Sequence, residues 1–114
     1  MTIDELTKVF DGCGIPVFDT VAPAGTALPY GVFRITDPNN SAADNKTYSK
    51  NAEGELELYT LGKDYRAMAI IENRLQDNNL PFSHDTSYLD GQKVLMELYS
   101  YGTVTGAVEP VPEV

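Results

Sequence analysis

The sequence ELELYTLGKDYRAMAIIENRLQDNN, residues 55–79, decides the fold, because its hydrophobic period changes partway from that of a strand to that of a helix. Before Gly62, apolar residues alternate along the chain, which predicts a strand with Leu56 and Leu58 on the core face. From Asp64 onward the apolar residues recur at helical spacing. They predict a helix whose buried face carries Met68, Ile71 and Leu75. The fold therefore contains a strand that turns directly into a helix.

Both ends of this helix carry sequence signals. Asp64 stands where a carboxylate accepts hydrogen bonds from the first free backbone N–H groups, and Asn78-Asn79 ends the periodic pattern. Tyr65 lies at the edge of the apolar face. Ile70 is expected to point away from that face, among charged and amide side chains. This placement makes Ile70 a candidate surface contact.

Gly62-Lys63 occupies a strand-to-helix junction, where phosphate-binding loops place their lysine. Such a loop also needs a glycine five residues before Gly62 and a serine or threonine directly after the lysine. The sequence has Glu57 and Asp64 at these two positions. We therefore expect no nucleotide site and interpret Gly62 as a turn residue.

The N-terminus predicts a first helix over about residues 2–11. Thr2 and Glu5 match a capping box, and the glycines at positions 12 and 14 end the helical pattern. Cys13 is interpreted as a small hydrophobic side chain at the end of this helix. The apolar side of the helix is expected to carry Ile3, Leu6, Phe10 and Cys13.

The remaining strands are predicted from alternation and turn residues. A short extended segment, IPVFDT, comes before a loop, and PYGVFRITD, residues 29–37, then predicts a strand. Residues 38–54 lack either period and form a connection long enough to be functional or disordered. Strands over residues 83–89 and 92–101 are joined by Asp90-Gly91, a favoured hairpin turn. The core face of the last strand is expected to carry Val94, Met96 and Leu98.

These elements predict an α+β fold, with a mostly antiparallel sheet of four to five strands and two helices packed on one face. We expect residues 1–101 to form a single domain and residues 102–114 to form a flexible acidic C-terminal tail. Two interpretations of the far face remain open: it contacts another protein, or IPVFDT and the loops fold over it. The far face is expected to carry Tyr30, Val32, Tyr59, Leu61, Leu95, Tyr99 and Tyr101.

The charge balance restricts the class of function. The chain has 114 residues, of which 17 are acidic and 8 basic, giving a net charge of -9. Direct binding to a nucleic acid backbone needs clustered Lys and Arg, and here the basic residues are scattered. No apolar run has the length of a membrane helix, and the N-terminus lacks the features of a signal peptide. We therefore expect a protein of the cytoplasm that does not bind the backbone of a nucleic acid.

No residue pattern predicts an enzyme, a metal site or a cofactor. His84 is the single histidine and Cys13 the single cysteine, so a nucleophilic pair would require the fold to bring them together. The segment DPNNSAADNKTY has the Asp and Asn content of a calcium loop but lacks its central glycine and its closing glutamate. We expect no catalytic residue, no metal and no bound cofactor.

Residues 55–101 combine a strand ending in Leu-Tyr-Thr, a Lys-Asp step, an amphipathic helix carrying Ile-Glu, and a hairpin that closes on alternating tyrosines. Residues 28–37, LPYGVFRITD, add a strand ahead of a long loop. With these features the chain resembles the tail-terminator (tail-completion) proteins of long-tailed bacteriophages, a family also described as minor capsid proteins. The resemblance covers roughly residues 28–101, and the acidic tail lies outside it.

The resemblance implies a structural virion protein that forms a hexameric ring of identical copies. Such a ring ends the polymerisation of the tail tube and offers a joining surface to the head. The implied partners are the tail tube protein and the head connector protein, while DNA passes through without specific binding and no membrane is involved. The implied location is the host cytoplasm during assembly and then the virion. Candidate contact residues are Tyr30, Arg34, Tyr48, Tyr59, Ile70, Tyr99 and Tyr101.

Three alternatives remain beside the terminator. A head-completion or connector protein belongs to the same structural class. A small monomeric module that binds one protein through its aromatic face belongs to another. An enzyme that uses Cys13 or His84 is the third.

Overall fold

The computed structural model describes residues 3–36, 53–89 and 93–102. Along the chain come helix α1 (Ile3–Leu6) and strands β1 (Val17–Asp19), β2 (Tyr30–Thr36) and β3 (Glu53–Leu61). Helix α2 (Tyr65–Asp77) and strands β4 (Phe82–Leu89) and β5 (Val94–Gly102) follow. The α+β class expected from the sequence is confirmed.

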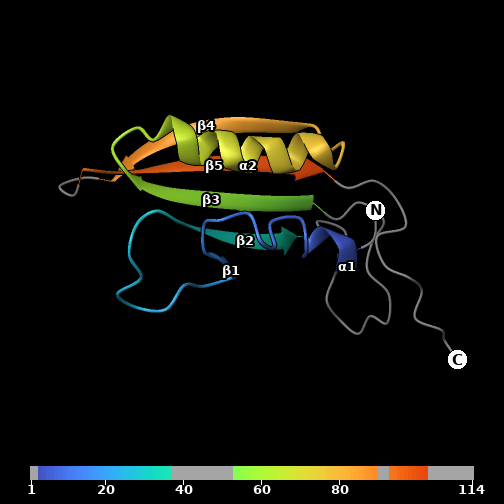
Figure 1. The fold of residues 1–114 in the computed structure, drawn as a ribbon, viewed down its shortest axis with the longest axis horizontal. Helices are drawn as coiled ribbons and strands as arrows, with labels where there is room; N and C mark the ends of the chain where they lie inside the picture. Colours follow the sequence, from blue (N-terminus) through green and yellow to red (C-terminus); the bar gives the residue numbers. More distant parts are fainter. Residues whose placement is uncertain (1–2, 37–52, 90–92, 103–114) are drawn as a thin grey trace, which may run out of the picture.

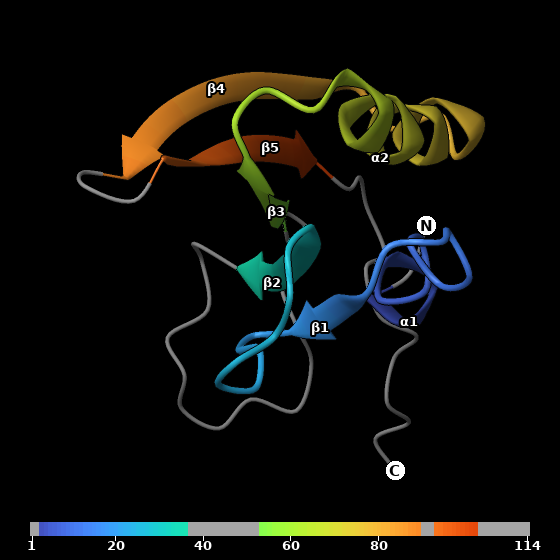
Figure 2. The ribbon, with the colours of Figure 1, turned by 60° about the vertical axis from the view of Figure 1, so that its left-hand side comes forward.

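The five strands form one sheet in the order β1-β2-β3-β5-β4. The pairs β2–β3, β3–β5 and β4–β5 are antiparallel, whereas β1 and β2 run parallel, so the sheet is mixed. The segment IPVFDT thus supplies an edge strand. Figure 1 shows α2 lying along the sheet, and Figure 2 shows α1 and α2 on the same side of it. This side is called the helix side below.

The strand-to-helix turn forms as the sequence predicts. Burial alternates along β3, with Leu56 and Leu58 fully buried on the helix side. Gly62 has a φ of 69°, a left-handed conformation that glycine adopts without strain, and this turns the chain toward α2. Asp64 caps the helix, because its Oδ1 accepts a hydrogen bond of 3.0 Å from the Ala67 N–H. The buried positions of α2 are Ala67, Met68, Ile71 and Leu75.

The N-terminal segment departs from the predicted helix of residues 2–11. Of the described residues in this range, Ile3–Leu6 is α-helical, and the chain then continues through tighter turns in which several N–H groups bond the carbonyl three residues back, as in Val9 to Leu6 and Asp11 to Lys8. Three residues per turn place Val9 in line with Leu6, which explains why Val9 is buried although the helical period left it off the apolar face. Thr2 of the expected capping box lies outside the described residues.

The faces of β5 are the reverse of those expected. Tyr99 pairs with Leu56 and Tyr101 with Gly54, so both tyrosines lie on the helix side, where they are 0% and 2% exposed. Leu95 and Glu97 share that side. Both alternating sets of β5 are apolar, so the residue pattern did not fix which set faces the core, and the pairing register with β3 decides it. The open side of β5 carries Val94, Met96 and Leu98.

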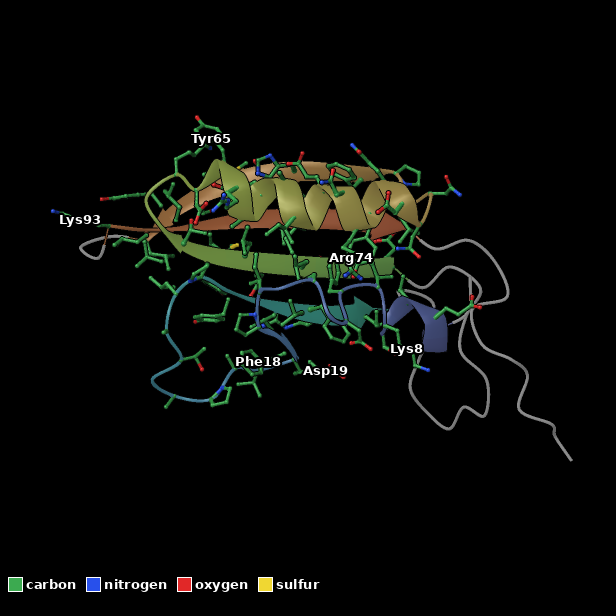
Figure 3. All side chains as sticks on the ribbon, viewed as in Figure 1. Lys8, Phe18, Asp19, Tyr65, Arg74 and Lys93 are labelled. Atoms are coloured by element: carbon green, nitrogen blue, oxygen red, sulfur yellow. The ribbon has the colours of Figure 1, made fainter. Side chains whose placement is uncertain are left out.

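Ile70 also differs from its expected position. It is half-buried and packs against the hydrophobic core instead of pointing into solvent. The N-terminal segment also contacts α2, one turn further along the helix. Arg74, one turn after Ile70, donates hydrogen bonds to the carbonyls of Val9 (3.4 Å) and Asp11 (2.8 Å). Figure 3 shows Arg74 on the side of α2 that faces this segment, with Tyr65 pointing outward.

Element boundaries differ slightly from those predicted. Strand β3 already begins at Glu53, inside the connection expected over residues 38–54, and β4 begins at Phe82. The remainder of that connection, the turn at residues 90–92 and the tail from residue 103 lie outside the described residues. Tyr48 and the calcium-loop-like segment lie outside them too.

Candidate interaction surface

The side of the sheet opposite the helices carries an aromatic ladder across three strands. Tyr30 of β2 stacks on its cross-strand partner Tyr59 of β3, with ring centroids 5.1 Å apart and an angle of 28° between the rings. Phe18 of β1 meets Tyr30 edge-on, at 6.3 Å and 69°. All three side chains are half-buried. Aromatic pairs of this kind stabilise a sheet surface and at the same time present large apolar area.

The ladder continues into an apolar row on β5. Met96 pairs across the sheet with Tyr59, and Leu98 pairs with Glu57, so both lie on the ladder's side and are half-buried. Leu61, at the end of β3, is 69% exposed. We call this surface the open face and define it as Phe18, Tyr30, Tyr59, Leu61, Met96 and Leu98.

A short polar network fixes the middle of the open face. Arg34 Nη1 lies 2.9 Å from Glu57 Oε2, and the Tyr59 hydroxyl donates a 2.8 Å hydrogen bond to Glu57 Oε1. Burial, and next the hydrogen bond to Glu57, raise the pKa of Tyr59 to about 12. Tyr59 is therefore a neutral donor at physiological pH, and its ring is held in one orientation.

On the helix side, β5 carries a fully buried carboxylate, that of Glu97. Its Oε1 accepts a 2.6 Å hydrogen bond from Thr86 Oγ1 and lies 2.6 Å from His84 Nε2. Lys63 Nζ lies 3.6 Å from Oε2. Burial by itself raises the pKa of Glu97, but the hydrogen bonds from Thr86 and His84 and the charge of Lys63 outweigh burial and lower it. Glu97 is thus a buried anion that ties β5 to β4 and to the turn before α2.

The two tyrosines expected on the surface are core residues. The Tyr99 hydroxyl donates a 2.8 Å hydrogen bond to Glu72 Oε2 of α2, and the Tyr99 ring stacks on His84 at 4.7 Å. Burial raises the pKa of Tyr99, as does its bond to Glu72, and burial raises the pKa of Tyr101. The Tyr101 ring meets Phe10 edge-on at 6.0 Å. Tyr99 holds α2 on the sheet, Tyr101 holds the segment that follows α1, and neither is available to a partner.

Of the candidate contact residues, the structure brings together Tyr30, Arg34 and Tyr59 on the open face. Tyr99 and Tyr101 lie in the core, and Ile70 is half-buried against the core. Sequence reasoning missed the Glu97 cluster. The one available signal was an acidic residue inside an apolar run, LMELY.

The described residues also show the surroundings of Cys13 and His84, the two residues that an enzyme would use. His84 contacts Glu97, while the Cys13 thiol donates to the Ile15 carbonyl at 3.5 Å, so the two have different partners. Within residues 3–36, 53–89 and 93–102, no group of three or more His, Cys, Asp or Glu side chains is arranged to hold a metal ion. No helix in this part of the chain is long and apolar enough to cross a membrane.

No family model, no curated protein and no solved structure matches this chain in the comparisons with known proteins.

Proposed function

We propose that this protein is a structural component of a bacteriophage particle that forms a ring at the end of the tail tube. The ring terminates polymerisation of the tube and provides the surface to which the head is joined. The protein acts through assembly, not catalysis, and works in the host cytoplasm before it becomes part of the virion. The family resemblance of residues 28–101 motivates this assignment.

The observation that supports an assembly role is the open face. The helices cover one side of the sheet, and the other side presents aromatic and aliphatic side chains from four of the five strands. Such surfaces typically mark contacts with other proteins. In a ring each subunit uses two different surfaces, one against each neighbour, and the ring closes when the rotation divides a full turn. The open face supplies one of these two surfaces.

The overall charge agrees with a ring through which DNA passes without being bound. A net charge of -9 per subunit repels DNA, and a ring multiplies this charge. DNA that passes through the lumen is therefore not retained, because few basic side chains are present to replace its counterions.

Electron microscopy of tail tubes mixed with the purified protein tests this function, combined with the solution mass from light scattering. We expect density for a ring at one end of each tube and tubes that no longer elongate. Leu61→Glu is expected to abolish ring density, because it places a charge on the open face. Leu61 is largely exposed, so the variant keeps its fold.

Tyr65→Glu is the matched control, because Tyr65 is 71% exposed but lies at the start of α2, away from the open face. It should form rings as the native protein does. A native protein that stays monomeric at high concentration and never associates with tail tubes would contradict the proposal. If that monomer captured one protein that is not part of a phage, the binding-module alternative would be favoured instead. Binding to the head and not to the tube would indicate the head-completion alternative.

A further inference from the structure

Strand β4 forms an open edge of the sheet. It is the last strand in the order and, within the described residues, pairs only with β5. The pairing runs one-to-one from Phe82 with Tyr101 to Leu89 with Val94, so the edge is eight residues long and has no bulge. Its six central residues are exposed. Along this edge, every second residue presents its backbone N–H and C=O groups to the outside.

This edge has little of the usual protection against pairing with another strand. Natural edge strands are blocked by charged side chains, above all lysine, by proline, by bulges or by being very short. The sequence FSHDTSYL contains one charged residue, Asp85, and no lysine or proline. Tyr88 also lies on it with 59% of its surface exposed. The opposite edge, β1, has only three residues.

We propose that two copies of this protein join antiparallel along β4, so that their sheets form one continuous sheet of ten strands. The occupant of the edge is a second copy because the strand is complementary to itself. The join is isologous, meaning that the same residues contribute from both sides. It goes beyond the ring proposed above, which needs two different surfaces.

The alternation of side chains between the two sides of the sheet restricts the register in which the two β4 strands can pair. In a continuous sheet, opposed residues point to the same side, so an even-numbered residue must oppose an even-numbered one. Two registers then pair seven residues. In one, Asp85 directly opposes Asp85 of the second copy, and like charges opposite each other destabilise the pair.

The other register places Thr86 opposite Thr86 and removes that conflict. Asp85 then opposes Ser87, and His84 opposes Tyr88, each twice by symmetry. The His84–Tyr88 pairs cover the exposed Tyr88 ring with an aromatic partner. No charged residue faces a like charge within the ladder. We infer that the dimer uses the register centred on Thr86.

Sedimentation velocity over a wide range of protein concentration tests this join. We expect the native protein to form a dimer reversibly, and more strongly at higher salt, because salt screens the repulsion between two acidic copies. Ser87→Asp places a carboxylate opposite Asp85 at two symmetric positions and is expected to weaken the dimer roughly 2- to 30-fold. Ser87→Lys places an ammonium group there and is expected to strengthen it by a similar factor.

Ser83→Asp is the matched control, because Ser83 lies on the same strand and the same side but opposes Leu89 in this register. It changes the net charge as Ser87→Asp does and is expected to weaken the dimer less. Equal effects of the two aspartates, or no strengthening by Ser87→Lys, would overturn the register. A native protein that is monomeric at every concentration and salt would overturn the join itself. Ring formation at tail tubes is tested with Leu61→Glu and Tyr65→Glu and not with the Ser87 variants, because Ser87 pairs with Met96 and lies on the same side of the sheet as the open face. Failure of this inference therefore leaves the proposed function to be judged by its own experiment.

Discussion

At the scale of single residues, Gly54 and Tyr101 show how one missing side chain makes room for another. They are cross-strand partners, and a Cβ atom added to Gly54 would lie 2.5 Å from Cζ and 2.8 Å from Oη of Tyr101. The tyrosine ring fills the space above the glycine and packs on Phe10. A side chain at position 54 therefore displaces a ring that anchors the N-terminal segment.

We expect Gly54→Ala to lower the free energy of unfolding by about 1–3 kcal/mol, the usual cost of forcing extra atoms into a packed core. Urea unfolding followed by circular dichroism measures it. Gly102→Ala is the control, because nothing lies within 4 Å of a Cβ atom there, and its effect should stay within about 0.5 kcal/mol. Equal stability of the two variants would contradict the packing described for Tyr101.

The positions of single residues could be predicted from the sequence where the spacing of the residues allowed only one arrangement. The capping position of Asp64 and the core leucines of β3 followed from their spacing alone. The partners of Glu97 did not, because His84 and Thr86 come from β4 and are set beside Glu97 only by strand pairing. The positions of Tyr99 and Tyr101 were missed for the same reason: alternation gives two sets of residues, and the register with β3 decides which set is buried.

At the scale of elements, one arginine connects α2 with the segment that follows α1. Arg74 donates to two carbonyls at the turns of residues 7–13, which satisfies backbone groups that no regular helix pairs there. Sequence analysis assigned this segment to a helix and Ile70 to the surface. Both errors concern tertiary packing, which leaves no local signal in the sequence.

Arg74→Ala is expected to cost roughly 1.5–3 kcal/mol of stability, the range for hydrogen bonds that involve a charged group. Hydrogen exchange should show faster exchange at the amides of residues 8–13, with α2 itself affected less. Arg66→Ala serves as the control, since Arg66 is on an exposed position of the same helix. If both variants exchange alike, the connection through Arg74 does not hold the segment in place.

At the scale of the whole molecule, acid has two opposing effects on stability. Protonation of the many carboxylates relieves the repulsion that accompanies a net charge of -9. Glu97 acts in the other direction, because its pKa is lowered in the folded protein from its ordinary value of 4.5. Its contribution is therefore fully present above pH 4.5 and is lost as the pH falls through the lowered pKa.

We expect the stability difference between the native protein and Glu97→Gln to be largest at neutral pH and to shrink as the pH falls below 4.5. Urea unfolding of both proteins at a series of pH values measures it, and the difference removes the effect of the other carboxylates. Asp85→Asn, on an exposed position of β4, controls for the loss of one charge. A difference that stays constant across the pH range would show that the charge of Glu97 is not what stabilises the fold.

The order of strands in the sheet has a kinetic consequence. Strands β4 and β5 are neighbours in the sequence and form a local hairpin, but β3 pairs with β5, and their ladder joins residues as distant as Glu53 and Gly102. Closing that span costs chain entropy before the ladder is formed, and α2 lies within it. Proteins fold more slowly when their contacts join residues that are distant in the sequence. Docking of the hairpin onto β3 is therefore the step that we expect to limit the rate at which this protein folds.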